Sequence, residues 1–204
     1  FDSFIFNILR NTFEDKTIGE LEKEFGLSLN TNAKNLVSLL LKKVININDI
    51  KSIRELDENE LEIKTVPVNP NNNMPWEAMS FPKMSLKDLA YEEWNDINNN
   101  YNHEASLKVD MDKNFIFLPI LKRKKKVKDK MKFEERKFWK FGKVKSWRPD
   151  KITLDGIRKE WEYCKMMVVN NEVETWNVVQ KSGRIIQKNN LLKSSLSNFI
   201  HIRP

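Results

Sequence analysis

Apolar side chains recur at helical spacing in the first quarter of the chain. Thr17 and Glu20 have the spacing of a capping box, in which a hydroxyl and a carboxylate three residues apart bind backbone N–H groups at a helix start. Gly26 is placed to end this helix. Over residues 34–44 apolar residues repeat at steps of three and four, which predicts a second amphipathic helix. A helical section is therefore expected over residues 1–50.

Alternating and continuous apolar runs further along the chain predict strands. Residues 60–68 largely alternate polar and apolar, which is typical of a half-buried strand that ends, or meets a sheet edge, at Pro67. Residues 115–121 are almost all apolar, as expected of a buried strand. The same reasoning predicts further strands over residues 138–147 and 173–179 and from residue 185.

Two more helices are predicted between these strands. Ser85 begins one that carries apolar residues to Trp94, and Asp155 caps another. The apolar face of the second consists of Ile157, Trp161, Cys164 and Val168. Because helices and strands mix after the leading helices, the chain is expected to be α/β or α+β, with a mixed-sheet core over residues 51–204.

Composition narrows the function classes. The 204 residues contain 36 Lys and Arg and 29 Asp and Glu, so the formal net charge is +7 and suggests a polyanionic partner. No apolar run approaches ~20 residues, so a membrane span is not expected. Cys164 is the single cysteine, which excludes a disulfide scaffold and a cysteine-based zinc site. The chain starts at Phe1 without a methionine, and we expect a fragment of a longer cytoplasmic protein.

The segment Glu62-Ile63-Lys64 is the main candidate for chemistry. Residues two apart on a strand point to the same side, so a carboxylate and an ammonium group would share one pocket. Phosphodiester cleavage uses such a pair, since a carboxylate holds Mg²⁺ and a lysine orients water and offsets phosphate charge. A second acidic ligand is needed, and upstream candidates are Glu55, Asp57 and Glu58. The alternative is an ordinary exposed strand face with alternating charges.

Two basic segments could either bind nucleic acid or have a purely structural role. The run Lys122–Lys126 follows a buried strand and is expected to be a solvated turn, or else to contact phosphates. Residues 138–147 mix aromatic and basic side chains, and we expect core packing on one strand face rather than a stacking platform for single strands. His103 and His201 have no partner at ligand spacing, so neither supports a metal site.

A series of motifs follows in order along the chain: Thr17-Ile18-Gly19-Glu20-Leu21, Lys34 at a helix start, Glu62–Val68, Trp76–Pro82, Phe115–Pro119, Trp147–Trp161 and Ile202-Arg203-Pro204. Taken together, these motifs resemble the MutH family, which comprises a mismatch-repair nicking endonuclease and the GATC-specific type II restriction endonucleases. Residues 79–82 are most similar to the C-terminal, second MutH-like domain of the two-domain restriction enzymes, and the resemblance covers nearly the whole chain.

The resemblance implies a PD-(D/E)xK restriction-endonuclease-like fold, a single MutH-like domain with a mixed central sheet flanked by helices. Glu62 and Lys64 match the family's Glu-x-Lys, but the Asp expected seven residues earlier is Glu55 here. Asp57 is the right type at the wrong spacing, and the helix position of a further family Glu falls on Lys42. These departures match the family's C-terminal domain, a noncatalytic effector that binds a second DNA site while the N-terminal domain cuts.

The resemblance also implies DNA contacts. Arg203 and Pro204 occupy the base-reading positions, and an arginine can donate two hydrogen bonds to guanine. Lys34 at a helix start and Lys64 in the cleft suit phosphates. The expected partners are double-stranded DNA at GATC and a catalytic domain in the same full-length chain.

Two alternatives remain open. The first is an active Mg²⁺-dependent endonuclease in which Glu62, Glu55 or Asp57 bind the metal and Lys64 assists cleavage. The second is a basic module that docks on a partner protein. Magnesium is expected as a cofactor only in the first of these.

Overall fold

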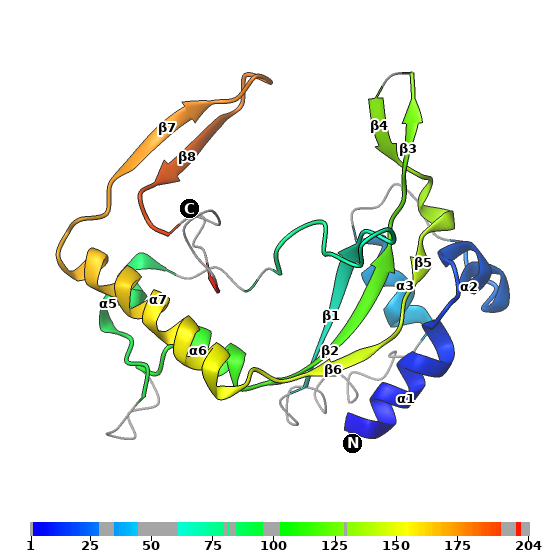
Figure 1. Cartoon of the computed structure of the whole chain (residues 1–204), viewed down its shortest axis with the longest axis horizontal. Helices are drawn as coiled ribbons and strands as arrows, with labels where there is room; N and C mark the ends of the chain where they lie inside the picture. Colours follow the sequence, from blue (N-terminus) through cyan, green and yellow to red (C-terminus); the bar gives the residue numbers. More distant parts are fainter. Residues whose placement is uncertain are drawn as a thin grey trace. The chain divides into compact units, whose positions relative to one another are not determined.

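Two compact units make up the chain in the computed structural model, and each is assembled from two separate stretches. Residues 1–80 and 113–148 form the first unit, and residues 81–112 and 149–204 form the second. Figure 1 shows the elements of both. The structure describes residues 2–28, 35–44, 61–79, 81, 85–95, 103–128, 130–192 and 199–200.

The described residues of the first unit form three helices and a mixed four-stranded sheet. Strand β2 is central: it pairs in parallel with β1 on one side and antiparallel with β5 and β6 on the other. A separate antiparallel hairpin, β3–β4, follows β2 in the chain. The bounds are α1 (Asp2–Phe13), α2 (Ile18–Glu24), α3 (Leu36–Val44), β1 (Leu61–Val68), β2 (Asn114–Leu121), β3 (Lys124–Val127), β4 (Lys130–Phe133), the 3₁₀ turn η1 (Arg136–Phe138), β5 (Lys140–Phe141) and β6 (Lys145–Trp147).

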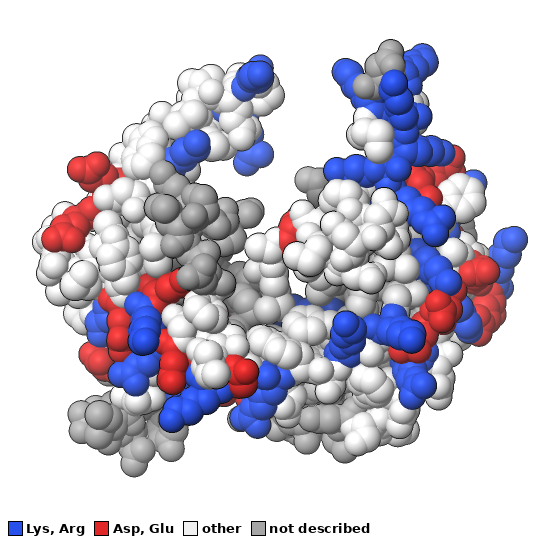
Figure 2. All heavy atoms as spheres, viewed as in Figure 1, with Lys and Arg blue, Asp and Glu red and all other residues white. Residues whose placement is uncertain are grey.

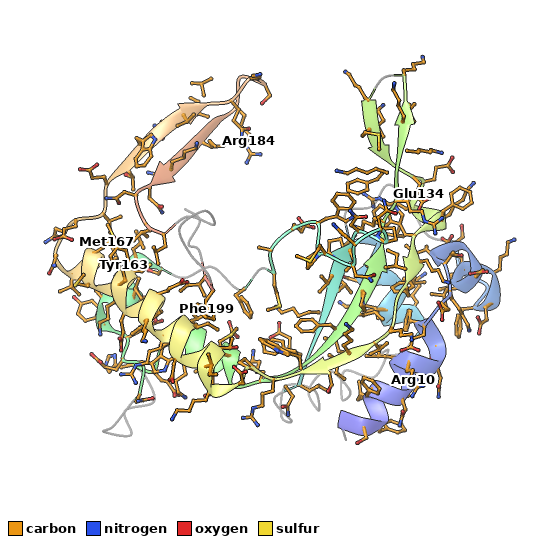
Figure 3. The ribbon with its side chains drawn as sticks, viewed as in Figure 1. Arg10, Glu134, Tyr163, Met167, Arg184 and Phe199 are labelled. Atoms are coloured by element: carbon orange, nitrogen blue, oxygen red, sulfur yellow. The ribbon has the colours of Figure 1, made fainter. Side chains whose placement is uncertain are left out.

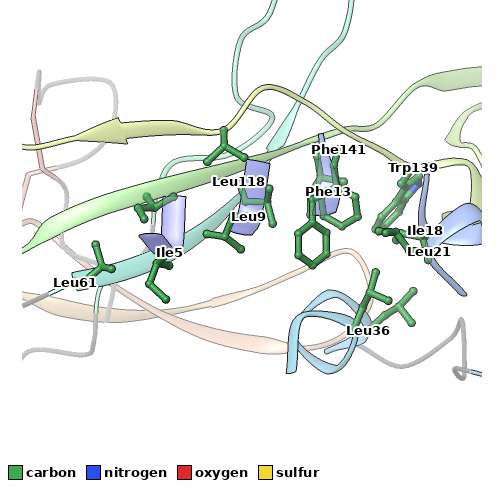
Figure 4. Packing of buried hydrophobic residues seen from close by; sticks show 14 residues of the cluster. Ile5, Leu9, Phe13, Ile18, Leu21, Leu36, Leu61, Leu118, Trp139 and Phe141 are labelled. Atoms are coloured by element: carbon green, nitrogen blue, oxygen red, sulfur yellow. The ribbon is translucent and has the colours of Figure 1, made fainter. Parts of the chain in front are cut away.

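One face of this sheet is covered by the N-terminal helices. Alternate residues of the central strand, Ile116, Leu118 and Ile120, point into a buried apolar cluster with residues from all three helices. Figure 4 shows this packing. The helical contribution consists of Ile5, Leu9, Phe13, Ile18, Leu21, Leu36 and Leu40. The opposite sheet face is therefore the one on which other side chains are available for function.

The predicted start and end of α2 are confirmed. The Thr17 side chain accepts the N–H of Glu20, and the Glu20 carboxylate accepts the N–H of Thr17 at 2.7 Å. The Thr17 backbone N–H and the Thr17 hydroxyl both donate to the exposed Glu20 carboxylate and hold its pKa below its ordinary value. Gly26 has φ +60°, a left-handed conformation that glycine adopts without a Cβ penalty, and the helix ends just before it.

In the second unit, the part of the chain that the structure describes forms three helices and an antiparallel hairpin. Its longest helix, α7, buries Ile157, Trp161 and Cys164 as expected, but Met167 replaces Val168 as the fourth buried residue. The predicted helix beginning at Ser85 is confirmed, although it ends before Trp94. The bounds are α5 (Leu86–Tyr91), α6 (Ser106–Met111), α7 (Lys151–Val169), β7 (Thr175–Val179) and β8 (Ile185–Asn189).

Three sequence predictions need correction. Helix α7 is capped by Asp150, not Asp155, because the Asp150 carboxylate accepts the N–H of Thr153 at 2.7 Å. Residues 138–147 form two short strands rather than one, since the N–H of Val144 leaves the ladder and donates to the Glu14 carboxylate at 2.8 Å. The run from Lys122 is not a simple turn, because most of it is strand β3.

The mixed α/β class and the strands over residues 61–68 and 114–121 are confirmed. Trp139 and Phe141 are buried, as expected for core aromatic residues of the segment 138–147. In the part of the chain that the structure describes, no helix has both the length and the apolar character to cross a membrane.

Candidate nucleic-acid interface

Glu62 and Lys64 lie on the sheet face that points away from the N-terminal helices. Leu61 belongs to the apolar cluster and Ile63 packs against it, so the even-numbered residues of β1 point the other way. The parallel register places Glu62 beside Phe115 of β2. The same face of the sheet therefore carries charged side chains on the edge of β1 and aromatic side chains on β2.

Glu62 and Lys64 were predicted to point to the same side of the strand, and in the structure they also form an ion pair. Glu62 Oε1 lies 2.5 Å from Lys64 Nζ, and the two side chains are 27% and 18% exposed. This result follows from the period of two along a strand, which brings side chains two residues apart to one side.

A second lysine, which the sequence did not predict, reaches the same carboxylate. Lys113 Nζ lies 3.6 Å from Glu62 Oε2, and that buried oxygen accepts no hydrogen bond from the described residues. Lys113 directly precedes β2, and the parallel pairing of β1 with β2, which places Leu61 beside Asn114, brings it to the same end of the two strands as Glu62. The three side chains carry two positive charges and one negative charge.

Among the described residues, this group offers a single carboxylate as a ligand for a magnesium ion. Hard divalent cations prefer several oxygen ligands, whereas the described site has one carboxylate held between two ammonium groups. Among the described residues, no three His, Cys, Asp or Glu side chains are grouped as metal ligands. The predicted partners Glu55 and Asp57 lie outside the described residues. Lys42 lies in the last turn of α3 and is exposed.

A cavity of about 1060 Å³ occupies the same sheet face beyond Lys64. Val66 and Val68 of β1 and Phe117 of β2 form part of its lining, and the exposed Lys143 and Lys145 add positive charge to it. The other lining residues are Asp15, Asn73, Pro75, Trp76, Glu77, Ala78, Met79, Pro119, Leu121, Gly142 and Trp147.

Three aromatic rings pack against one another on this face of the sheet. The rings of Phe115 and Phe117 are nearly parallel, with centroids 6.1 Å apart. Trp147 lies against both, at 5.6 Å and 5.7 Å. The sequence shows that this region is rich in aromatic residues. It does not show that the pairing of β2 with β6 places Trp147 beside the two phenylalanines.

Two lysines that follow β2 lie over aromatic rings, one of which, Trp76, lines the cavity. Lys122 Nζ lies 4.1 Å from the centroid of Trp139, and Lys124 Nζ lies 4.1 Å from the centroid of Trp76. Burial lowers the pKa of Lys122, and the Glu77 carboxylate opposes that shift. Ammonium groups over aromatic faces are stabilised by the ring quadrupole, so these two lysines are fixed in place.

The predicted base-reading residues Arg203 and Pro204 lie outside the described residues, as does Lys34. The described residues closest to Arg203 in sequence are Phe199 and Ile200. Phe199 packs against Gly156 of α7 (Figure 3). The backbone N–H groups of both residues donate to Glu160 Oε2, at 3.2 Å and 2.7 Å.

No protein-family model and no curated protein matches the sequence.

Proposed function

We propose that this chain is a MutH-like domain with a PD-(D/E)xK type of fold that binds duplex DNA at GATC. In this proposal it is the noncatalytic effector domain of a type II restriction endonuclease. A catalytic domain in the same full-length chain would cut the DNA.

The observation that carries this proposal is the position of Glu62 between Lys64 and Lys113. A nuclease site would gather carboxylates around a metal ion, whereas the described side chains of this group are one carboxylate and two ammonium groups, which suit an anion. A phosphate of the DNA backbone is an anion that lysine ammonium groups bind well. The nearby Lys143 and Lys145 extend positive charge over the same sheet face.

The roles of the remaining residues come from the family resemblance. Arg203 would donate to the O6 and N7 atoms of guanine, and Pro204 would shape the loop that presents it. Lys34 would contact a phosphate from a helix start. Lys64 would contribute charge rather than catalysis. In this proposal, the phosphate contacts position the duplex, and Arg203 distinguishes GATC from other DNA sequences.

One observation favours the active endonuclease as a second candidate. Glu62 and Lys64 share one side of β1, which is the geometry that Glu-x-Lys chemistry requires. This candidate needs at least one further carboxylate, from Glu55 or Asp57.

Cleavage and binding assays separate these candidates. The chain is incubated with a GATC duplex and Mg²⁺ or Mn²⁺, beside the Lys64→Ala variant as control. The effector proposal predicts an intact duplex in both samples. Cleavage that is lost in Lys64→Ala would establish the endonuclease instead.

Binding is then measured with GATC and scrambled duplexes at several salt concentrations. We expect a preference for GATC and an affinity that falls steeply as salt rises. Equal affinity for the two duplexes would contradict sequence-specific recognition. A chain that binds no duplex would instead favour the protein-interaction module.

A further inference from the structure

The β3–β4 hairpin has two chemically different faces. Its register pairs Lys124 with Phe133, Lys126 with Met131, and Lys125 with Lys132. Because side chains alternate along a strand and directly opposite residues point to the same side, Phe133 and Met131 share one face with Lys124 and Lys126. The other face carries Lys125, Val127, Lys130 and Lys132. Figure 2 shows lysine side chains gathered along this hairpin.

The aromatic face anchors the base of the hairpin to the first unit. Lys124 Nζ lies over the rings of Trp76 and Phe133, and these two rings meet edge to face at 5.5 Å. Trp76 Nε1 also donates to the carbonyl oxygen of Lys122 at 3.0 Å. The hairpin is therefore held at its base on the wall of the cavity described above.

The lysine face has no internal compensation for its charge. Lys125, Lys130 and Lys132 are exposed, and none of them has a carboxylate partner within the described ranges. Lys125 and Lys132 lie directly opposite each other, an arrangement that repels and weakens a strand pair. Asp129 is the single acidic residue between positions 124 and 133 of the sequence.

The turn adds a further lysine at a position that does not favour one. Lys128 has φ +44°, in the left-handed region where glycine and asparagine are preferred for hairpin turns. These lysines therefore stabilise neither the turn nor the pairing of the two strands. Their charge is better explained by an external anion than by the stability of the hairpin.

We propose that the face formed by Lys125, Lys130 and Lys132 binds phosphates of duplex DNA and contributes affinity without sequence discrimination. Lysines two positions apart on a strand are about 7 Å apart, so they form a regular row of point charges. A two-stranded ribbon also fits the major groove, which is about 12 Å wide. Lysine carries charge without the fixed fork of arginine, so it suits phosphate contact rather than base reading.

This inference rests on the proposed function, since it assumes that DNA is the partner. It adds a contact surface that none of the motifs Glu62–Val68, Lys34 and Arg203 includes.

The test is a triple variant, Lys125→Gln, Lys130→Gln and Lys132→Gln, in the full chain. The matched control replaces Lys23, Lys87 and Lys159 with Gln, which removes three exposed positive charges elsewhere. Both variants lose the same net charge, so the comparison separates a local contact from a general charge effect. Circular dichroism and a thermal melt verify that each variant is folded.

The readout is the slope of log affinity against log salt, measured with GATC and scrambled duplexes. Each lost phosphate contact lowers the magnitude of the slope by about 0.9, so we expect a decrease of about 2 to 3 in the hairpin variant. The control should keep a slope close to that of the unmodified chain. The ratio of affinities for the two duplexes should stay the same in both variants.

Four results overturn the inference or its basis, and they are distinguishable. A hairpin variant with the same slope as the control overturns the hairpin contact alone. A changed discrimination ratio shows that the hairpin reads sequence and contradicts a purely phosphate role. If the unmodified chain binds DNA without GATC preference, the proposed function fails, while the slope still tests the hairpin. If an acidic polypeptide such as polyglutamate displaces DNA at equal charge concentration, the partner is not specifically a nucleic acid.

Discussion

Glu160 Oε2 accepts the backbone N–H of Ile200 at 2.7 Å, and the same oxygen accepts the N–H of Phe199 at 3.2 Å. One carboxylate on α7 thus holds two consecutive backbone groups of a segment that is distant in sequence. The segment leads to Arg203 three residues later. The orientation of the chain that enters the proposed base-reading loop therefore depends on a side chain outside that loop.

We predict that Glu160→Ala lowers stability by about 1–3 kcal/mol, because it leaves two backbone donors without their acceptor. It should also reduce the preference for GATC over a scrambled duplex, since Arg203 would be less well positioned. Urea denaturation and DNA competition measure the two effects. Glu162→Ala is the control, because its exposed pair with Arg158 should contribute less than about 1 kcal/mol. Equal losses in the two variants would contradict the role of Glu160.

Gly156 and Phe199 make a second contact at the same place on α7. A Cβ on Gly156 would lie 2.3 Å from a carbon of the Phe199 ring, so the ring would have to move. Opposing this cost, alanine is more favourable than glycine in a helix interior by about 1 kcal/mol. We predict that Gly156→Ala is neutral or destabilising in the unmodified chain but stabilising in a Phe199→Ala background. Chemical denaturation of the four proteins gives the coupling energy, and a value near zero would contradict the contact.

The charge balance around Glu62 gives a prediction for DNA affinity. Replacing this carboxylate by an amide removes one negative charge beside Lys64 and Lys113, so the site becomes more attractive to phosphate. A unit charge at about 4 Å in water is worth about 1 kcal/mol, so Glu62→Gln should tighten binding about fivefold in the presence of EDTA. Fluorescence anisotropy at fixed salt measures the change. The control Glu162→Gln changes the net charge by the same amount and should have a smaller effect on DNA affinity. If Glu62→Gln is folded but binds DNA more weakly, the result would argue against a phosphate site.

The N-terminus of α7 shows how a local motif is assigned to the wrong residue. Asp150 and Asp155 both precede apolar residues of the helix, and only the backbone shows which one caps it. Hydrogen bonds from Thr153 lower the pKa of Asp150, so the ionised form is favoured in the folded state. Its contribution to stability is therefore present above the unfolded pKa and is lost as pH falls through the folded pKa.

We predict that Asp150→Ala lowers the melting temperature at pH 7 and that the difference from the unmodified chain shrinks in acid. Asp150→Asn should retain most of the stability, since asparagine is also a good cap. Asp155→Ala lies within the helix and should change the melting temperature little. Thermal melts over a pH series measure all three, and a larger effect at Asp155 would contradict the assignment of the cap.

Periodic patterns in the sequence predicted those helices and strands that are determined by their own local residues. The capping box of Thr17 and Glu20 and the alternation that pairs Glu62 with Lys64 are both local, and both are observed. Lys113 was missed because its place beside Glu62 depends on the parallel register of two strands far apart in sequence. No spacing rule contains that information.

The β3–β4 hairpin was missed for a different reason. Its strands are mostly lysine, so they lack the apolar alternation that indicates a strand. The hairpin depends on cross-strand pairing and on the contact of Lys124 with Trp76, a residue about fifty positions earlier. Several predicted site residues lie outside the described residues: Glu55, Asp57, Lys34, Arg203 and Pro204. The predictions made for them remain predictions.

Cys164 allows a test of the packing of α7 that is independent of DNA. The thiol is fully buried, and burial raises its pKa. Because the folded pKa exceeds the unfolded value of about 8.5, this group's contribution to stability is complete below that pH and declines as pH rises above it. We predict that the native thiol reacts slowly with Ellman's reagent at pH 8 and rapidly in urea. The loss of stability between pH 8 and 10 should be smaller in Cys164→Ala than in the unmodified chain. Rapid labelling of the native chain would contradict the prediction, because it would show that this side of α7 is open to solvent.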